Sequence, residues 1–110
     1  MQQTIVYELN EVPIRLFEFY AEAFRSSAFA KLKNSGNCFQ TKTPDLGHLS
    51  PWVTWPTFHR GVANIDHQIS DLGQDLRKIN LEIPSIWDVL ASSGVKVGVF
   101  GSLHSYPIPS

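Results

Sequence analysis

Two apolar runs rich in β-branched residues, one near each end of the chain, constrain the fold more than any other feature of the sequence. Residues 5–9 (IVYEL) and 95–100 (VKVGVF) have the composition of buried strands. Between them, apolar residues recur at helical spacing, most clearly over residues 13–24 and 85–94. Strands that alternate with helices favour parallel pairing with right-handed crossovers. The sequence therefore predicts an α/β fold, with a partial, doubly wound, mainly parallel sheet and flanking helices.

The middle of the chain gives weaker signals. A third strand is predicted at residues 37–43, where the single cysteine, Cys38, is expected to be a buried and inert thiol. Residues 43–51 combine proline, aspartate and glycine, which is typical of a loop. Residues 64–78 are polar with scattered apolar positions, so we expect irregular structure there.

Composition limits the classes of function. The 110 residues suffice for one domain, and a hydrophobic content of 43% is ample for a core. Nine Lys and Arg residues against ten Asp and Glu residues give a formal net charge of −1 without a basic stripe, which argues against a nucleic-acid-binding module. No apolar stretch is long enough to span a membrane. The polar N-terminus does not have the pattern of a signal peptide, so a cytoplasmic location is favoured.

The segment SPWVTWPTFHRG, residues 50–61, carries the strongest chemical signal. Thr54 lies two positions before Pro56, at the expected start of a short helix, and proline is favoured in the first helical turn. A hydroxyl at that position faces unpaired backbone N–H groups and the positive end of the helix dipole, which favour a bound anion and the ionisation of an attacking hydroxyl. The alternative is a threonine that only caps the helix.

This segment, followed by His67, resembles the nucleophile region of the alkaline phosphatase superfamily, in particular its type I phosphodiesterase and nucleotide pyrophosphatase branch. Residues 5–13 resemble the first strand of these enzymes, and residues 85–102 resemble the helix and strand that follow the nucleophile. The resemblance covers residues 4–107. It implies that Thr54 attacks the phosphorus or sulfur of a phosphate or sulfate ester and forms a covalent intermediate.

Three residues depart from the pattern of the superfamily. Its first strand ends in an aspartate followed by a glycine, where this chain has Asn10 and Glu11. Its histidine precedes a glycine, where this chain has Gln68 after His67. The predicted helix also looks about a turn shorter than in better-known members of the branch, which leaves Thr57 as the alternative nucleophile.

The resemblance also implies a metal site and a substrate pocket. Asn10, Glu11 and Thr54 are the candidate ligands of divalent metal ions, Zn²⁺ or alternatively Mn²⁺ or Mg²⁺. A turn or cap is the alternative role for Asn10. The candidate substrate contacts are Trp52, Trp55 and His104. Packing against the rest of the molecule is the alternative for at least one of the tryptophans.

Two functions from different classes follow. In the first, residues 1–110 are the N-terminal fragment of a larger metal-dependent hydrolase domain. Enzymes of the superfamily are longer, and most of their metal ligands lie further along the chain, so little turnover is expected from this part alone. In the second, residues 1–110 are a small, non-catalytic α/β module for binding or assembly. Self-association through an exposed sheet edge would fit this second function.

Overall fold

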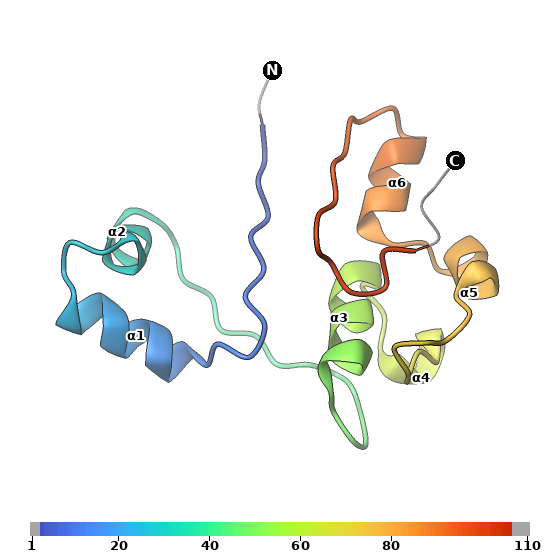
Figure 1. Cartoon of the computed structure of the whole chain (residues 1–110), viewed down its shortest axis with the longest axis horizontal. Coiled ribbons are helices and arrows are strands. Elements are labelled where there is room, and N and C mark those ends of the chain that lie inside the picture. Colours follow the sequence, from blue (N-terminus) through green and yellow to red (C-terminus); the bar gives the residue numbers. More distant parts are fainter. Residues whose placement is uncertain (1–2, 107–110) are drawn as a thin grey trace. The chain divides into compact units, whose positions relative to one another are not determined.

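The computed structural model describes residues 3–106, which form six helices (Figure 1). The helices are α1 (Ile14–Ala23), α2 (Ala28–Ser35), α3 (Pro51–Arg60), α4 (Asn64–His67), α5 (Arg77–Glu82) and α6 (Ile86–Ser92). The chain divides into two compact units, and the boundary lies between Thr41 and Lys42. Each unit has its own packing.

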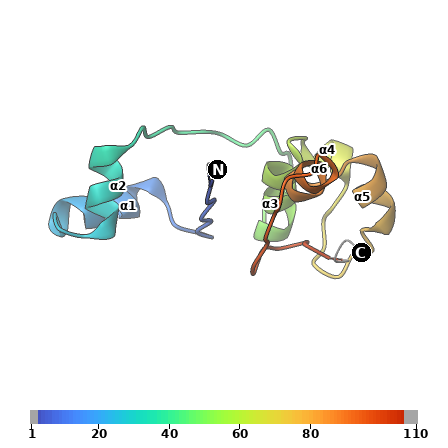
Figure 2. The ribbon, with the colours of Figure 1, turned by 90° about the horizontal axis from the view of Figure 1, so that it is seen from above.

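The first unit packs α1 against α2, and the axes of the two helices cross rather than run side by side (Figure 2). Each helix contributes one small buried residue, Ala21 from α1 and Ala30 from α2. The ring of Phe29 meets the ring of Phe17 edge-on, with centroids 5.3 Å apart, and lies 6.1 Å from that of Tyr20. Phe17 and Phe29 therefore pack between the two helices, whereas Tyr20 and Phe24 of the apolar stripe predicted in residues 13–24 are 45% and 54% exposed.

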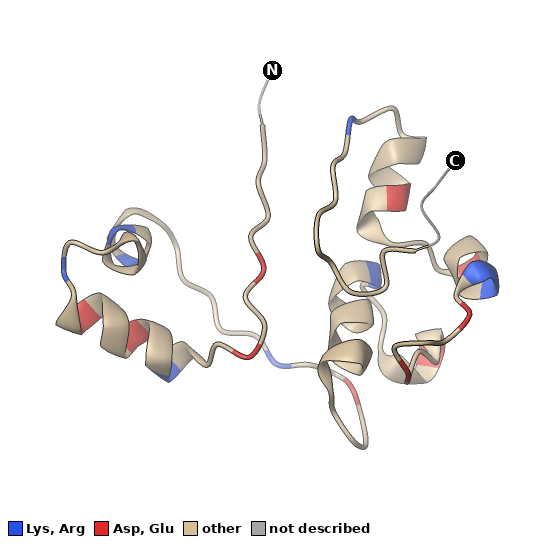
Figure 3. Ribbon diagram, in the orientation of Figure 1, with Lys and Arg blue, Asp and Glu red and all other residues tan. Residues whose placement is uncertain are grey.

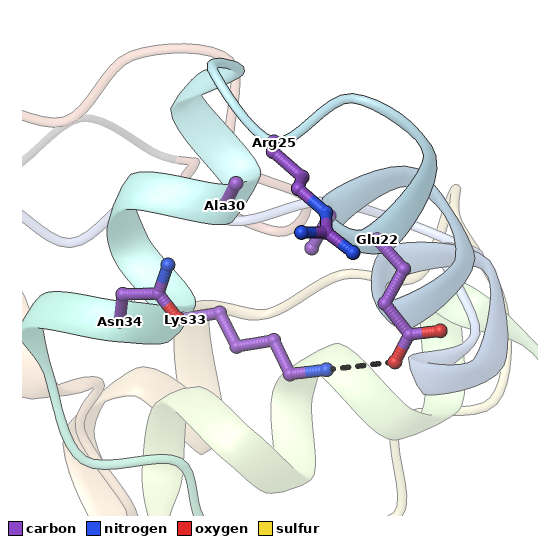
Figure 4. Close-up of a pocket in the computed structure, with 6 residues that line it drawn as sticks. Glu22, Arg25, Ala30, Lys33 and Asn34 are labelled. Carbon is purple, nitrogen blue, oxygen red and sulfur yellow. Dashed lines mark hydrogen bonds and ion pairs between the residues drawn. The ribbon is translucent and has the colours of Figure 1, made fainter.

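A hollow of about 310 Å³ lies between α1 and α2 (Figure 4). It is lined by Ala21, Glu22, Arg25, Ala30, Lys33 and Asn34. Lys33 Nζ lies 3.4 Å from Glu22 Oε1, and the Glu22 side chain is mostly exposed. An exposed ion pair contributes little to stability. The contact between α1 and α2 is therefore held mainly by alanine and aromatic side chains.

In the second unit, the side chain of Arg60 joins α3 to α5 through hydrogen bonds. The guanidinium of Arg60, the last residue of α3, donates to Asn80 Oδ1 at 2.6 Å and to the Ile83 carbonyl oxygen. The side chains of Ile69 and Leu76, from the chain between α4 and α5, are almost completely buried. Burial of such side chains supplies the main favourable free energy of this unit.

The predicted α/β fold is wrong, because residues 3–106 contain no strand and therefore no sheet. The runs at 5–9, 37–43 and 95–100 are neither helix nor strand. β-branched residues favour an extended backbone, but a strand forms only when a neighbouring strand supplies hydrogen bonds. Cys38 is exposed rather than buried, since the segment that contains it has no sheet to cover it.

Charges of both signs are interspersed along both units (Figure 3). Helix α5, for example, contains Arg77 and Lys78 together with Glu82. Lys78 Nζ lies 3.7 Å from Glu82 Oε1. Within residues 3–106, no helix has the length and apolar character needed to cross a membrane. The predicted absence of a spanning segment therefore holds for the described residues.

Candidate functional site

Helix α3 begins one turn earlier than the sequence predicts. Ser50 is its N-cap and Pro51 its first residue, so Thr54 is the fourth helical residue rather than the opening one. The backbone N–H groups of Val53 and Thr54 both donate to the Ser50 carbonyl oxygen at 3.0 Å. A serine followed by proline is itself a strong helix start, because proline at the first position has no N–H that would need a partner. Thr54 therefore has a paired amide and does not form the predicted cradle for an anion.

The hydroxyl of Thr54 remains chemically available. Its side chain is half-buried, and Oγ1 donates its one hydrogen to the Ser50 carbonyl oxygen at 3.1 Å. Among residues 3–106, the structure gives this oxygen no donor, so its lone pairs are not occupied by the described protein groups. An oxygen in this state can attack an electrophile or bind a metal ion.

The hydroxyl of Thr57 is in the opposite situation. It is buried, and Oγ1 lies 2.7 Å from Asp45 Oδ1, 2.9 Å from His67 Nε2 and 3.3 Å from the Val53 carbonyl oxygen. These three partners come from the loop before α3, from α4 and from α3 itself. Thr57 therefore connects three parts of the second unit, and its oxygen is enclosed by them.

The hydrogen bonds around His67 fix the direction of this network. The backbone N–H of Ile69 donates to His67 Nδ1 at 2.9 Å, so Nδ1 is an acceptor and the ring proton lies on Nε2. Nε2–H then donates to Thr57 Oγ1, and the Thr57 hydroxyl donates to Asp45 Oδ1. His67 is therefore not arranged as a base that removes the proton of Thr57, and the network is suited to holding structure.

Asp45 also secures the start of α4. Its Oδ1 accepts from the backbone N–H of Asn64 at 2.7 Å, the first residue of that helix. The Asn64 side chain in turn bonds both backbone groups of Leu46, with Nδ2 to the carbonyl oxygen at 2.8 Å and Oδ1 to the N–H at 3.2 Å. One carboxylate therefore caps α4 and fixes the loop that precedes α3.

The ionisation of both end groups follows from this environment. Burial by itself raises the pKa of Asp45, but the hydrogen bonds from Thr57 and from the Asn64 backbone outweigh it and leave the pKa below its usual value. Burial lowers the pKa of His67, and the nearby Asp45 charge only partly opposes this. The network is thus most stable with an ionised Asp45 and a neutral His67.

The predicted substrate contacts differ in their surroundings. Trp52 is 41% exposed. Trp55 stacks on the ring of His59 at a centroid distance of 5.5 Å, and His59 lies 4.7 Å from the ring of Trp87 in α6. His104 is buried, and its Nε2 lies 3.1 Å from the Asp71 carbonyl oxygen. Trp55 and His104 therefore have packing contacts, whereas Trp52 is partly exposed to solvent.

The predicted metal ligands are not brought together in either unit. Asn10 and Glu11 are exposed turn residues of the first unit, and Thr54 belongs to the second. An amide and a carboxylate oxygen are suitable donors for a hard divalent ion such as Mg²⁺ or Mn²⁺. However, no group of three or more His, Cys, Asp or Glu side chains within residues 3–106 is arranged to hold a metal ion. Metal binding by this set stays a prediction.

Sequence reasoning did not single out Asp45 as part of a site. It named Thr57 as an alternative nucleophile and His67 as part of a resemblance, but it gave no reason to pair them. The one local signal is the triplet Thr43-Pro44-Asp45 in the loop before α3, and such turn-forming triplets are common in loops.

No family model matches the sequence, and neither a curated protein nor a solved structure matches the chain. The resemblance to the alkaline phosphatase superfamily therefore rests on the motifs in the sequence, and the activity it implies is a matter for proposal.

Proposed function

We propose that this chain is the nucleophile-bearing N-terminal part of a metal-dependent hydrolase of phosphate or sulfate esters, related to the alkaline phosphatase superfamily. The observation that carries the proposal is the backbone at the two departing positions where the family has glycine. Glu11 and Gln68 stand where the family has glycine, and both adopt a φ of 55°. That left-handed conformation is one that glycine adopts without strain and other residues rarely adopt. The backbone at these two positions is therefore one that glycine would fit, which supports the resemblance.

Thr54 is the nucleophile in this proposal. Its half-buried hydroxyl keeps its lone pairs, whereas the hydroxyl of Thr57 is enclosed by Asp45 and His67. Attack by Thr54 Oγ1 forms a bond to phosphorus or sulfur while the bond to the leaving oxygen breaks, and water then releases Thr54. A bound divalent ion would lower the pKa of the attacking hydroxyl. Trp52, which is 41% exposed, lies on the same helix and would contact an aryl or nucleoside group.

The test uses the protein from its natural source, at its full natural length. Hydrolysis of bis(4-nitrophenyl) phosphate, 4-nitrophenyl phosphate and 4-nitrophenyl sulfate is measured with added Zn²⁺, Mn²⁺ or Mg²⁺. We expect Thr54→Ala to lower kcat/KM by at least about a thousandfold, because it removes the group that forms the covalent intermediate. Circular dichroism of the variant checks that it folds.

Thr57→Ser is the matched control, since it keeps a hydroxyl in the buried network, and we expect it to retain most activity. Unchanged activity of Thr54→Ala would exclude Thr54 as the nucleophile. If the unaltered protein hydrolyses none of the three esters with any of the metal ions, the hydrolase proposal itself fails for these ester classes.

One observation favours the second candidate function, a non-catalytic module for binding or assembly. The side chains of Ile5, Phe39 and Phe100 are each more than 80% exposed. Exposed apolar side chains in extended segments are suited to contact with another protein. Absence of catalysis together with protection of these segments in the natural protein would support this function over the first.

A further inference from the structure

A chain of buried hydrogen bonds joins three segments of the second unit. It runs from Ile69 N–H to His67, from His67 to Thr57, and from Thr57 to Asp45. His67 is 1% exposed, and Asp45 and Thr57 are also buried. Thr57 belongs to α3 and His67 to α4. Asp45 belongs to the loop before α3, and Ile69 follows α4. Loss of one link therefore affects the attachment of the others.

In this series of hydrogen bonds, the two ring nitrogens of His67 have opposite roles: one accepts and the other donates. Nδ1 accepts from the Ile69 amide at 2.9 Å, and Nε2 donates to Thr57 Oγ1 at 2.9 Å. Both roles are possible only for a neutral ring. A second proton on the ring would have to occupy Nδ1, where it would face the N–H of Ile69. Two donors would then point at each other in a buried position, and the link to Ile69 would be lost.

We propose that His67 is an acid-sensitive latch, and that protonation of its ring releases the backbone around Ile69, which the neutral ring holds at the end of α4. The latch is closed when the ring is neutral and both nitrogens keep their partners. It opens when the ring gains a proton, because the buried amide of Ile69 then needs a new acceptor. This inference does not depend on the proposed hydrolase function.

The charged groups around the ring act in both directions. Burial disfavours the charged ring, and so do Arg60 of α3 and His104 of the C-terminal segment. Asp45 of the preceding loop and Asp66 of α4 favour it. The balance lowers the pKa of His67 below 6.5, its value in an unfolded chain.

The sign of the pH effect follows from linkage. Because the unfolded chain binds this proton more readily than the folded one, the stabilisation by His67 is fully present above pH 6.5. It is lost as the pH falls below that value. Asp45 contributes in a separate window, since its lowered pKa gives stabilisation that is lost only as the pH falls below 3.8.

The test is a measurement on the complete 110-residue chain. Imidazole ¹⁵N chemical shifts report the tautomer of each histidine, and amide hydrogen exchange reports the protection of Ile69. We expect His67 to be the Nε2–H tautomer near pH ~7.5, and the protection factor of Ile69 to fall by up to about tenfold by pH ~5.5. A His67 ring that carries its proton on Nδ1, or protection of Ile69 that stays constant while the ring titrates, overturns the proposal.

Two variants separate the latch from a general effect of acid. His67→Gln keeps a donor that can reach Thr57 but does not titrate, so its protection near residue 69 should not change over the same pH range. His48→Gln removes an exposed histidine of the loop before α3, and it should retain the pH dependence of the unaltered chain. Loss of that dependence in His48→Gln also contradicts the proposal. If His67→Gln does not fold, the tautomer and exchange of the unaltered chain still decide the question.

Discussion

The hydroxyl of Thr57 makes polar contacts with groups that are far apart in the sequence. Asp45 precedes it by 12 residues and His67 follows it by 10. A buried donor or acceptor that loses its partner costs more than the net gain of an ordinary hydrogen bond. The effect of removing this hydroxyl should therefore exceed the effect of removing the hydroxyl of Thr54, whose bond to Ser50 is local.

We expect Thr57→Val to lower the free energy of unfolding by about 1–3 kcal/mol, because the Nε2–H of His67 loses its acceptor in a buried position. The shape of the side chain is nearly unchanged, so the effect reports the hydroxyl. Urea denaturation of the 110-residue chain, followed by circular dichroism, measures the difference. Thr54→Val is the control and should change the free energy by less than about 0.5 kcal/mol. Equal effects of the two substitutions would show that the buried network contributes no special stability.

At the scale of elements, helices α3 and α4 both end in a left-handed residue. Gly61 follows α3 with a φ of 68°, and Gln68 follows α4 with a φ of 55°. Glycine adopts this conformation without steric strain, whereas other residues pay about 1 kcal/mol or more. Nothing in the sequence indicates a left-handed glutamine.

Gln68→Gly should therefore stabilise the chain by about 0.5–1 kcal/mol, because relief of strain outweighs the added freedom of the unfolded chain. The Gln68 side chain is exposed, so its removal should cost little packing. The midpoint of thermal or urea unfolding measures the gain. Gln40→Gly is the matched control at an exposed position without a positive φ, and it should not stabilise the chain. A destabilised Gln68→Gly variant would contradict the strain at this position.

For the whole molecule, the important feature is exposed apolar surface on the second unit. The ring of Phe100 is fully exposed, and the alternating residues Val95, Val97 and Val99 before it are each at least 39% exposed. The sequence predicts self-association through a sheet edge, and the described residues have no sheet. Exposed apolar side chains nevertheless favour association, because contact removes them from water.

We expect the 110-residue chain to associate reversibly, and Phe100→Lys to weaken this association by about tenfold or more, in line with the burial of one aromatic side chain. Sedimentation velocity over a range of concentrations gives the dissociation constant. Gln40→Lys adds the same charge at an exposed polar position and should have little effect. A chain that stays monomeric at all concentrations, or equal weakening by both variants, would show that Phe100 is not part of a contact.

The sequence by itself determined the elements whose signals are local. Apolar spacing over residues 13–24 predicted α1, and the same spacing over residues 85–94 predicted α6, because apolar periodicity acts within a few residues. Residues 64–78, expected to be irregular, contain α4 and the start of α5, since these helices are too short for a periodic signal.

Only the tertiary structure decided which distant residues meet. The pairing of Thr57 with Asp45 and His67 depends on how α3, α4 and the loop before α3 pack together. No sequence pattern links these three residues. Whether the β-rich runs form strands also depends on the tertiary structure. A run such as 95–100 specifies an extended backbone, but a strand requires hydrogen bonds from a partner that no local pattern can supply.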